Sequence, residues 1–258
     1  TATSAKFQCG LCSGRFFWMS PYEAPMDVAV DIYSGAMKGF ANWPAETAAV
    51  TSTRFVGITA SAAGTLYLTP YSAKHILRIR NNGGFSDATR RCGTIAPTPV
   101  RCLNLPAHNR YGHSGPMMIA PLRQDDLRLS VHAQSLGDGY GAAVYANNSI
   151  WMLPTTGTQP LIRVNVDAVS EEGSSPPTTE YDVPWPNQHR FISASPTTLW
   201  VVPADATGGI LILDTASGAL LRTIASWPAG VKATTSTPMF SGTAVTGAAG
   251  EEDVWLIP

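Results

Sequence analysis

Short stretches in which apolar and polar residues alternate recur along the chain and predict β-strands. The clearest are residues 26–31, 75–80, 127–131 and 161–166. A period of two places one face of a strand in a core and the other against a neighbour or water. Turn residues follow at 31–35 and 214–218, where an aspartate can bond its own backbone and a glycine can adopt a positive φ angle. The pattern therefore predicts an all-β protein.

A second kind of strand carries a large apolar residue, usually aromatic, and ends in proline. Its copies end at Pro21, Pro70, Pro121, Pro154, Pro203 and Pro258, which are 49, 51, 33, 49 and 55 residues apart. Proline lacks the amide hydrogen, so it terminates strand pairing. A repeat of about 50 residues built from short strands is typical of the blades of a β-propeller.

Alignment on these prolines predicts four strands in each unit. The first strands begin at residues 6, 54, 190 and 239, and the alternating stretches, 127–131 among them, are third strands. We expect one β-propeller domain over residues 1–258, with five to six four-stranded blades, the last of them incomplete. Residues 85–140 break the spacing, so they hold either a blade without its outer strand or an insertion. The chain stops after a second strand, which predicts an open closure or a continuation beyond Pro258.

Each unit has a first strand, a Gly/Ser turn, an aromatic strand that ends in proline, an alternating strand, an Asp-x-x-Ser-Gly turn and a fourth strand. This order is similar to the repeats of YVTN-type β-propellers and of the virginiamycin B lyase-like group. Residues 190–230 match best, residues 6–44 nearly as well, and residues 54–84 and 141–186 in part. The resemblance implies a propeller fold and specifies a blade, not an activity. In lyase-like blades the aromatic strand commonly ends in a polar or acidic residue that faces the site, whereas each copy here ends in proline.

Tryptophans take two repeated positions. Trp18, Trp151, Trp200 and Trp255 share one position of the aromatic strand, which predicts packing between blades. Trp43, Trp185 and Trp227 each precede a proline where a blade ends, and we interpret them as structural pegs.

Composition narrows the possible partners. Charged residues make up 14% of the chain, below the roughly 25% of ordinary soluble domains, and the net charge is −1. Because the net charge is close to zero, the chain creates no electrostatic field that would attract nucleic acid or an anionic membrane. It also lacks a run of 18 apolar residues, so we expect no membrane span.

Four cysteines fall into two local pairs, Cys9 with Cys12 and Cys92 with Cys102. An even number of nearby cysteines favours disulfides and an oxidising compartment. Asn147 begins an Asn-Asn-Ser acceptor for N-glycosylation in a predicted hairpin turn. We therefore expect a disulfide-bonded glycoprotein that is extracellular or on the cell surface.

Candidate binding residues gather in loops at one end of the predicted strands. His108, Arg110 and His113 form a dense polar cluster, which is either a solvated loop or part of a central pocket. Loops on a rigid scaffold often carry function. The same face would carry Tyr22, Tyr71, Arg123, His189 and Asp205.

The sequence offers no clear set of residues for a catalytic site. Asp125 and Asp126 are adjacent in a predicted strand and so point to opposite faces. The five histidines do not have metal-ligand spacing, and we see neither a Gly-x-Ser-x-Gly elbow nor a phosphate-binding glycine loop. We assign no catalytic residue, metal or cofactor.

Three hypotheses follow. The first is a non-enzymatic propeller that acts as a binding or structural module for a protein or glycan partner. The second is a propeller enzyme, a lyase or metal-assisted hydrolase, in which His108, His113, His189 and Asp125 converge near the central channel. The third is a structural subunit that joins copies of itself through strands at an open end.

Overall fold

The computed structural model describes residues 5–50, 53–61, 64–81, 127–131, 139–155, 159–165, 178–182, 189–204, 208–228, 231, 240–246 and 251–257. Within these ranges the strands form four antiparallel sheets of four strands and one sheet of two. Each sheet is a blade whose strands follow one another in chain order, so the all-β propeller fold predicted from the sequence is confirmed.

The blades are numbered along the chain. Blade 1 contains β1 (Phe7–Ser13), β2 (Phe16–Pro21), β3 (Asp27–Asp31) and β4 (Met37–Phe40). Blade 2 contains β5 (Phe55–Ala60), β6 (Leu66–Pro70), β7 (Leu77–Asn81) and β8 (Leu127–Val131). Blade 3 contains β9 (Tyr140–Ala146), β10 (Ser149–Pro154), β11 (Leu161–Asn165) and β12 (Thr178–Tyr181). Blade 4 contains β13 (His189–Ala194), β14 (Thr198–Pro203), β15 (Ile210–Asp214) and β16 (Leu220–Ile224), and blade 5 contains β17 (Gly242–Thr246) and β18 (Asp253–Ile257).

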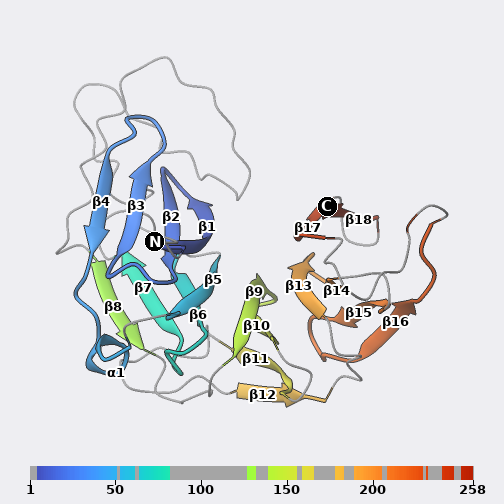
Figure 1. Cartoon of the computed structure of the whole chain (residues 1–258). Helices are drawn as coiled ribbons and strands as arrows, with labels where there is room; N and C mark the ends of the chain where they lie inside the picture. Colours follow the sequence, from blue (N-terminus) through green and yellow to red (C-terminus); the bar gives the residue numbers. More distant parts are fainter. Residues whose placement is uncertain are drawn as a thin grey trace, which may run out of the picture.

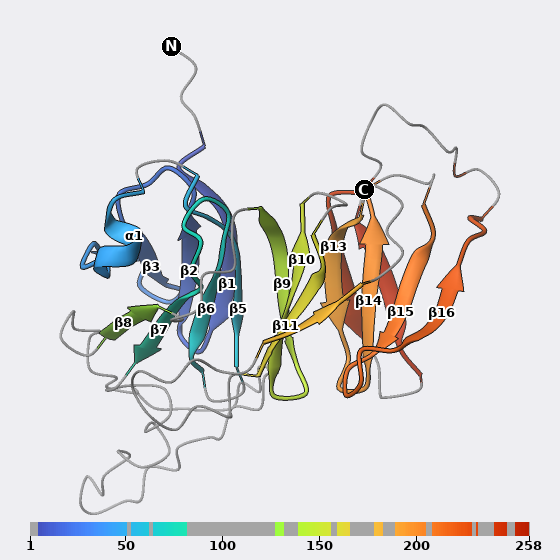
Figure 2. The same ribbon diagram turned by 90° about the horizontal axis from the view of Figure 1, so that it is seen from below.

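The blades stand side by side in an arc (Figure 1). The first strands lie on its inner side, where β1 contacts β5, β5 contacts β9, β9 contacts β13 and β13 contacts β17. The strands lie roughly along one common axis through the thickness of the arc (Figure 2). Blades 1 and 5 are the two ends of this arc.

The third strand predicted at residues 127–131 is instead the outer strand of blade 2. β8 pairs antiparallel with β7, with Leu77 opposite Val131 and Asn81 opposite Leu127. The sequence pattern could not distinguish the two positions, because a third and a fourth strand alternate in the same way. Blade 2 therefore keeps its outer strand. Pro121 lies outside the described residues.

The core consists of apolar layers between neighbouring blades. Trp18 packs with Leu66 and Leu68 between blades 1 and 2. Tyr67, in the equivalent position of blade 2, packs with Ile150 and Met152 of blade 3. Trp151 packs with Leu199 and Val201 of blade 4.

Trp200 holds the same position in blade 4 and is half-buried. Ser193 lies opposite Trp200 and hydrogen-bonds through Oγ with Oγ1 of Thr243 in blade 5, at 3.3 Å. The prediction that aromatic residues fill equivalent slots between blades is confirmed for Trp18 and Trp151. It is wrong for Trp255, which is 60% exposed on the outer face of blade 5.

The tryptophans that precede proline are pegs, as the sequence predicted for Trp43 and Trp227. Trp43 Nε1 donates to Pro25 O at 2.7 Å, and its ring stacks on Phe55 of blade 2 with the centroids 6.1 Å apart. Trp227 Nε1 donates to Gly208 O at 3.1 Å, and its ring stacks on Phe240 at 5.4 Å. Each peg thus fastens the end of one blade to the beginning of the next. Trp185 lies outside the described residues.

One helical turn, α1 (Ala45–Ala48), lies between blades 1 and 2. In the part of the chain that the structure describes, no helix has the length and apolar character needed to cross a membrane.

Candidate functional site

The candidate site lies on the face of the propeller that carries the loops between second and third strands. It is the rim formed where each second strand ends in its proline. We define the rim by the residues that follow these prolines, which are Tyr22, Tyr71, Thr155 and Ala204. Tyr22 and Tyr71 are half-buried in equivalent places in blades 1 and 2. The structure therefore brings two of the predicted binding residues to one rim.

Main-chain hydrogen bonds link the blades along this rim. Tyr22 N donates to Lys6 O, Arg54 N to Tyr22 O, Tyr71 N to Arg54 O, Gly139 N to Tyr71 O, and Thr155 N to Gly139 O, at 2.7–3.0 Å. Phe240 N donates to Ala204 O at 3.3 Å between blades 4 and 5. We call this series the rim belt. Strand pairing within a blade stops at the proline, and the rim belt gives the main-chain groups there other hydrogen-bond partners.

In the rim belt the main chain makes the structural contacts, and the side chains are not needed for them. Its bonds use only N–H and C=O groups, so they do not depend on which side chain follows the proline. The four rim positions accordingly carry tyrosine twice, threonine and alanine. A fixed backbone with variable side chains is the arrangement found in loops that recognise ligands.

A polar layer lies directly beneath the rim. Ser20 Oγ donates to Gly57 O at 3.5 Å, and a methyl group on Gly57 would meet Thr69 Oγ1 at 2.8 Å and Gly141 O at 3.2 Å. Gly57 therefore lets β5 approach β9 closely. Thr69 Oγ1 is buried and has no hydrogen-bond partner among the described residues.

Two buried titratable residues, Asp27 and Arg54, influence each other between blades 1 and 2. Asp27 is fully buried, and burial raises the pKa of its carboxyl well above the usual value, although the charge of Arg54 opposes the shift. The same burial lowers the pKa of Arg54, against the charge of Asp27. The guanidinium lies 4.9 Å from the ring centroid of Trp43, donates through Nε to Val50 O, and reaches Ala24 O from Nη1 at 3.5 Å. Because both side chains are buried, they do not face a ligand.

A strained corner, which no sequence pattern predicts, lies next to Tyr71. Thr53 and Lys74 have φ angles of 47° and 62°, which side chains other than glycine rarely adopt. Thr53 Oγ1 and Ser72 Oγ share a hydrogen bond of 2.8 Å, which fixes this corner. Neither threonine nor lysine signals a positive φ angle in a sequence, so only the structure reveals it.

Of the other predicted binding residues, only the main chain of His189 lies within the described part of the chain. His189 begins β13 and its backbone pairs with Pro203, so its main chain lies at the rim end of blade 4. The polar cluster of His108, Arg110 and His113 lies outside the described residues, as do Arg123, Asp205 and Asp125. Convergence of these residues near the channel remains a prediction.

The predicted bridge between Cys9 and Cys12 is wrong, because both thiols are free and exposed. Both residues lie in β1, three positions apart. Residues an odd number of positions apart in a strand point to opposite faces, and three positions span roughly 10 Å, beyond the reach of a disulfide. Cys92 and Cys102 lie outside the described residues.

Asn147 is exposed in the turn between β9 and β10, as the sequence predicted. Asn147 and Asn148 have φ angles of 46° and 56°, and Asn147 Nδ2 donates to Thr215 O of blade 4 at 3.4 Å. Ser149 is fully buried, so the acceptor triplet is only partly exposed in the folded protein. Glycosylation at Asn147 stays a prediction.

A carboxylate with two hydroxyls lies at the opposite face, between blades 4 and 5. Ser195 Oγ donates to Glu252 Oε1 at 2.7 Å, and Thr198 Oγ1 lies 3.3 Å from the same oxygen. Trp200 Nε1 donates to Thr198 Oγ1 at 3.0 Å. This network ties the turns of two blades together. Within the described ranges, no three His, Cys, Asp or Glu side chains are placed to hold a metal ion.

Comparison with known proteins places this geometry among β-propellers. Neither a family model nor a curated protein sequence matches the chain. Among solved structures, two of virginiamycin B lyase from Staphylococcus aureus align over 100% of the chain. One is selenomethionine-substituted (TM-score 0.58, 15% identity), and the other is a catalytically inactive variant with quinupristin (TM-score 0.56, 14% identity).

The β-propeller domain of Cps50 (Swd1) from Myceliophteria thermophila aligns over 99% of the chain, with a TM-score of 0.51 and 10% identity. The chain spans 65% of the lyase chains and 64% of the Cps50 domain. At such identities the likeness concerns the fold alone. The chain thus has a β-propeller fold similar to that of virginiamycin B lyase.

Proposed function

We propose that the protein is a non-enzymatic β-propeller that binds a protein or glycan partner at its rim. The observation that carries this proposal is the position of Tyr22 and Tyr71, half-buried at equivalent points of a rim whose backbone the rim belt holds in place. Tyrosine offers a large contact area at a low cost in conformational entropy, and it is enriched where proteins bind partners.

Other features of the rim support this role. The strained corner of Thr53 and Lys74 adjoins Tyr71, and an exposed lysine adds a hydrogen-bond donor with positive charge. Strained backbone is concentrated at functional sites because the surrounding structure must hold it in place. His189 and Asp205 stay predicted members of this surface, because the side chain of His189 and the whole of Asp205 lie outside the described residues.

The proposal is tested with the purified chain on a glycan array and a peptide array. We expect wild-type binding to be lost when Tyr22 and Tyr71 are both replaced by alanine. Tyr33→Ala is the matched control, because Tyr33 is 64% exposed in a turn at the opposite face. Failure to bind either array, or equal losses in the control, would contradict the proposal.

A second assay addresses the enzymatic alternative. One of the solved lyase structures contains quinupristin, so this compound is the direct probe. We expect its mass and concentration to stay unchanged after incubation with the chain. Turnover that scales with protein concentration would establish an enzyme and overturn the non-enzymatic role.

We also propose that the protein is extracellular or on the cell surface. The exposed Asn147 turn and the spacing of Cys92 and Cys102 support this location. Thiol counting under denaturing conditions without reductant tests it: we expect two free thiols, from Cys9 and Cys12. Four free thiols in protein from its native source would contradict it.

A further inference from the structure

Arg54 lies in the rim belt between the two rim tyrosines. Its amide donates to Tyr22 O at 3.0 Å, and its carbonyl accepts a hydrogen bond from Tyr71 N at 2.9 Å. A single residue therefore joins the main chain that follows the proline of blade 1 to the main chain that follows the proline of blade 2. A shift of the Arg54 backbone would change how the two tyrosines are placed relative to each other.

Three partners fix the side chain of Arg54 beneath the rim. Its Nε donates to Val50 O, its Nη1 donates to Ala24 O at 3.5 Å, and its Cζ lies 4.9 Å from the ring centroid of Trp43. Ala24 belongs to the loop between β2 and β3, whereas Trp43 and Val50 belong to the segment between β4 and β5. The guanidinium thus connects two separate segments of the chain, and Arg54 as a whole is only 7% exposed.

Burial makes Arg54 a weak source of net stability. The cost of removing a charge from water offsets most of what its contacts contribute. This cost is evident at the site, because burial lowers the pKa of Arg54 and raises the pKa of Asp27. A guanidinium also supplies direction, since its N–H donors form a planar fork that fits its acceptors in one orientation. The buried side chain is therefore better suited to fixing a geometry than to stabilising the fold.

The belt residues that precede the first strands of the neighbouring blades are built differently. Lys6 accepts the amide of Tyr22 with its carbonyl, and its side chain is exposed. Gly139 links Tyr71 to Thr155 and has no side chain. Of these three positions, only the one between the two tyrosines has a buried side chain that can hold its main chain from below.

We propose that Arg54 is a positioning residue of the rim, whose buried guanidinium fixes the main chain between Tyr22 and Tyr71 and so sets how these side chains meet a partner. Arg54 itself does not touch the partner. Its role rests on the proposed binding function of the two tyrosines, but their placement is measurable without a ligand. Loss of the guanidinium should alter the placement of both tyrosines in a chain that stays folded.

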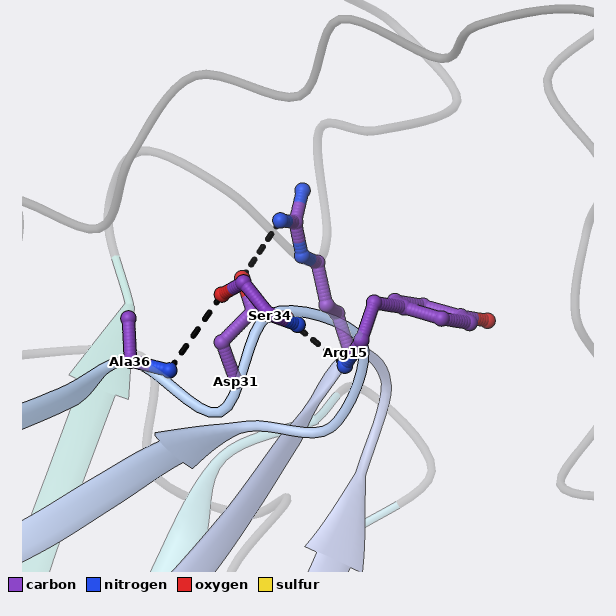
Figure 3. A network of polar contacts seen from close by, with 5 residues as sticks. Arg15, Asp31, Ser34 and Ala36 are labelled. Atoms are coloured by element: carbon purple, nitrogen blue, oxygen red, sulfur yellow. Dashed lines mark hydrogen bonds and ion pairs between the residues drawn. The ribbon is translucent and has the colours of Figure 1, made fainter.

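Arg15 provides the matched control. It lies between β1 and β2, at the opposite end of these strands from the rim, and its guanidinium reaches Asp31 at 2.5 Å (Figure 3). Like Arg54 it lies near an aromatic ring, since its Cζ is 5.8 Å from the ring centroid of Tyr33. Its carbonyl accepts from Ile32 N at 3.1 Å, so its main chain takes no part in the rim belt.

The placement of the tyrosines is followed by fluorine NMR of the chain labelled with fluorotyrosine. The chain has eight tyrosines, and the resonances of Tyr22 and Tyr71 are assigned by replacing each with phenylalanine. In Arg54→Met both resonances should shift, and the Tyr71 amide should exchange its hydrogen about tenfold faster. In Arg15→Met both resonances and this exchange rate should stay as in the wild type.

Circular dichroism confirms that the variants fold. Should Arg54→Met not fold, Arg54→Lys takes its place, because lysine keeps the charge without the planar fork. Unchanged resonances of Tyr22 and Tyr71 in the folded Arg54 variant, or equal changes in Arg15→Met, overturn the positioning role.

Binding is measured separately, on the glycan and peptide arrays. For a probe that the wild type binds, Arg54→Met should lower the affinity about tenfold, because the tyrosines are no longer preorganised, and Arg15→Met should not. Equal affinity of Arg54→Met and wild type would contradict the positioning role. Equal binding by wild type and the double alanine variant of Tyr22 and Tyr71 would instead contradict the proposed function, and the two failures are thus distinguishable.

Discussion

The ring of Tyr181 in blade 3 lies directly over the α-carbon of Gly218 in blade 4: a methyl group on Gly218 would come within 2.1 Å of Tyr181 Cε1. Gly218 also has a φ angle of 74°, so its turn needs glycine for two reasons. The equivalent Gly35 in blade 1 has a φ angle of 69°, but without a ring above it. Both turns carry the cost of a positive φ angle, and only the turn of Gly218 also packs against another blade. Comparing them therefore distinguishes the effect of backbone strain from that of packing between blades.

Replacing each glycine by alanine should give different losses of stability. Gly35→Ala should lower the free energy of unfolding by about 1–2 kcal/mol, the cost of a left-handed conformation. Gly218→Ala should cost about 1–3 kcal/mol more, because Tyr181 must move. Urea denaturation of both variants measures the difference. Equal losses would show that the contact between Tyr181 and the turn does not contribute.

The shared position of Trp151 and Trp255 permits a second comparison. Trp151 is fully buried between blades, whereas Trp255 is 60% exposed. Trp151→Ala should lower the free energy of unfolding by about 3–5 kcal/mol, because it leaves a cavity. Trp255→Ala, measured in dilute protein, should change it by only about 0.5 kcal/mol. A large loss for Trp255 in dilute protein would mean that its face is covered within a single chain.

The buried Asp27 should make stability fall as the pH rises. Its pKa is raised in the folded protein, so the folded state holds the proton more tightly than the unfolded state, in which the pKa is near 3.8. The stabilising contribution of the protonated form is therefore complete below pH 3.8 and is lost as the pH rises through the folded pKa. Asp27→Asn should be more stable, relative to wild type, at pH 8 than at pH 4, as measured by urea denaturation.

Asp31 is the control with the opposite sign. The hydrogen bond from Arg15 is the main cause that lowers its pKa to about 2, and amides of its own turn assist. Its contribution is present above pH 3.8 and is lost as the pH falls towards 2. Asp31→Asn should therefore lose stability near neutral pH and approach wild type at pH 2. The same pH slope in both variants would refute the assignment of the two carboxyls.

Cys9 and Cys12 should react with maleimide in the folded protein without prior reduction, because both are exposed in β1. Mass spectrometry of tryptic peptides locates the label, and Cys9→Ser and Cys12→Ser identify each site separately. Labelling that requires reductant would contradict the free thiols of the structure.

The repeat made most of the fold predictable from the sequence. The spacing of the prolines located the second strands, and the turns at Asp31 and Asp214 located the ends of the third strands. These features are local, so a sequence displays them directly. The pairing of β8 with β7 is not local, and nothing in residues 127–131 distinguishes an outer strand from a third strand.

The candidate site was predictable only in part. Tyr22 and Tyr71 were placed on the loop face because each follows a repeated proline. The rim belt could not be predicted, because main-chain atoms make its bonds and every residue except proline has the same donor and acceptor. The error at Trp255 has a related origin: a repeat shows which slot a residue holds, but not whether a neighbouring blade fills the space beside it.

The rim belt has a practical consequence for engineering. Positions 22, 71 and 155 contribute their peptide groups to the scaffold while their side chains are at least partly exposed, so these side chains are available for redesign; Ala204 is only 3% exposed and is kept. A library that randomises these three codons should yield a high proportion of folded variants. The propeller could then serve as a frame for selecting new recognition surfaces.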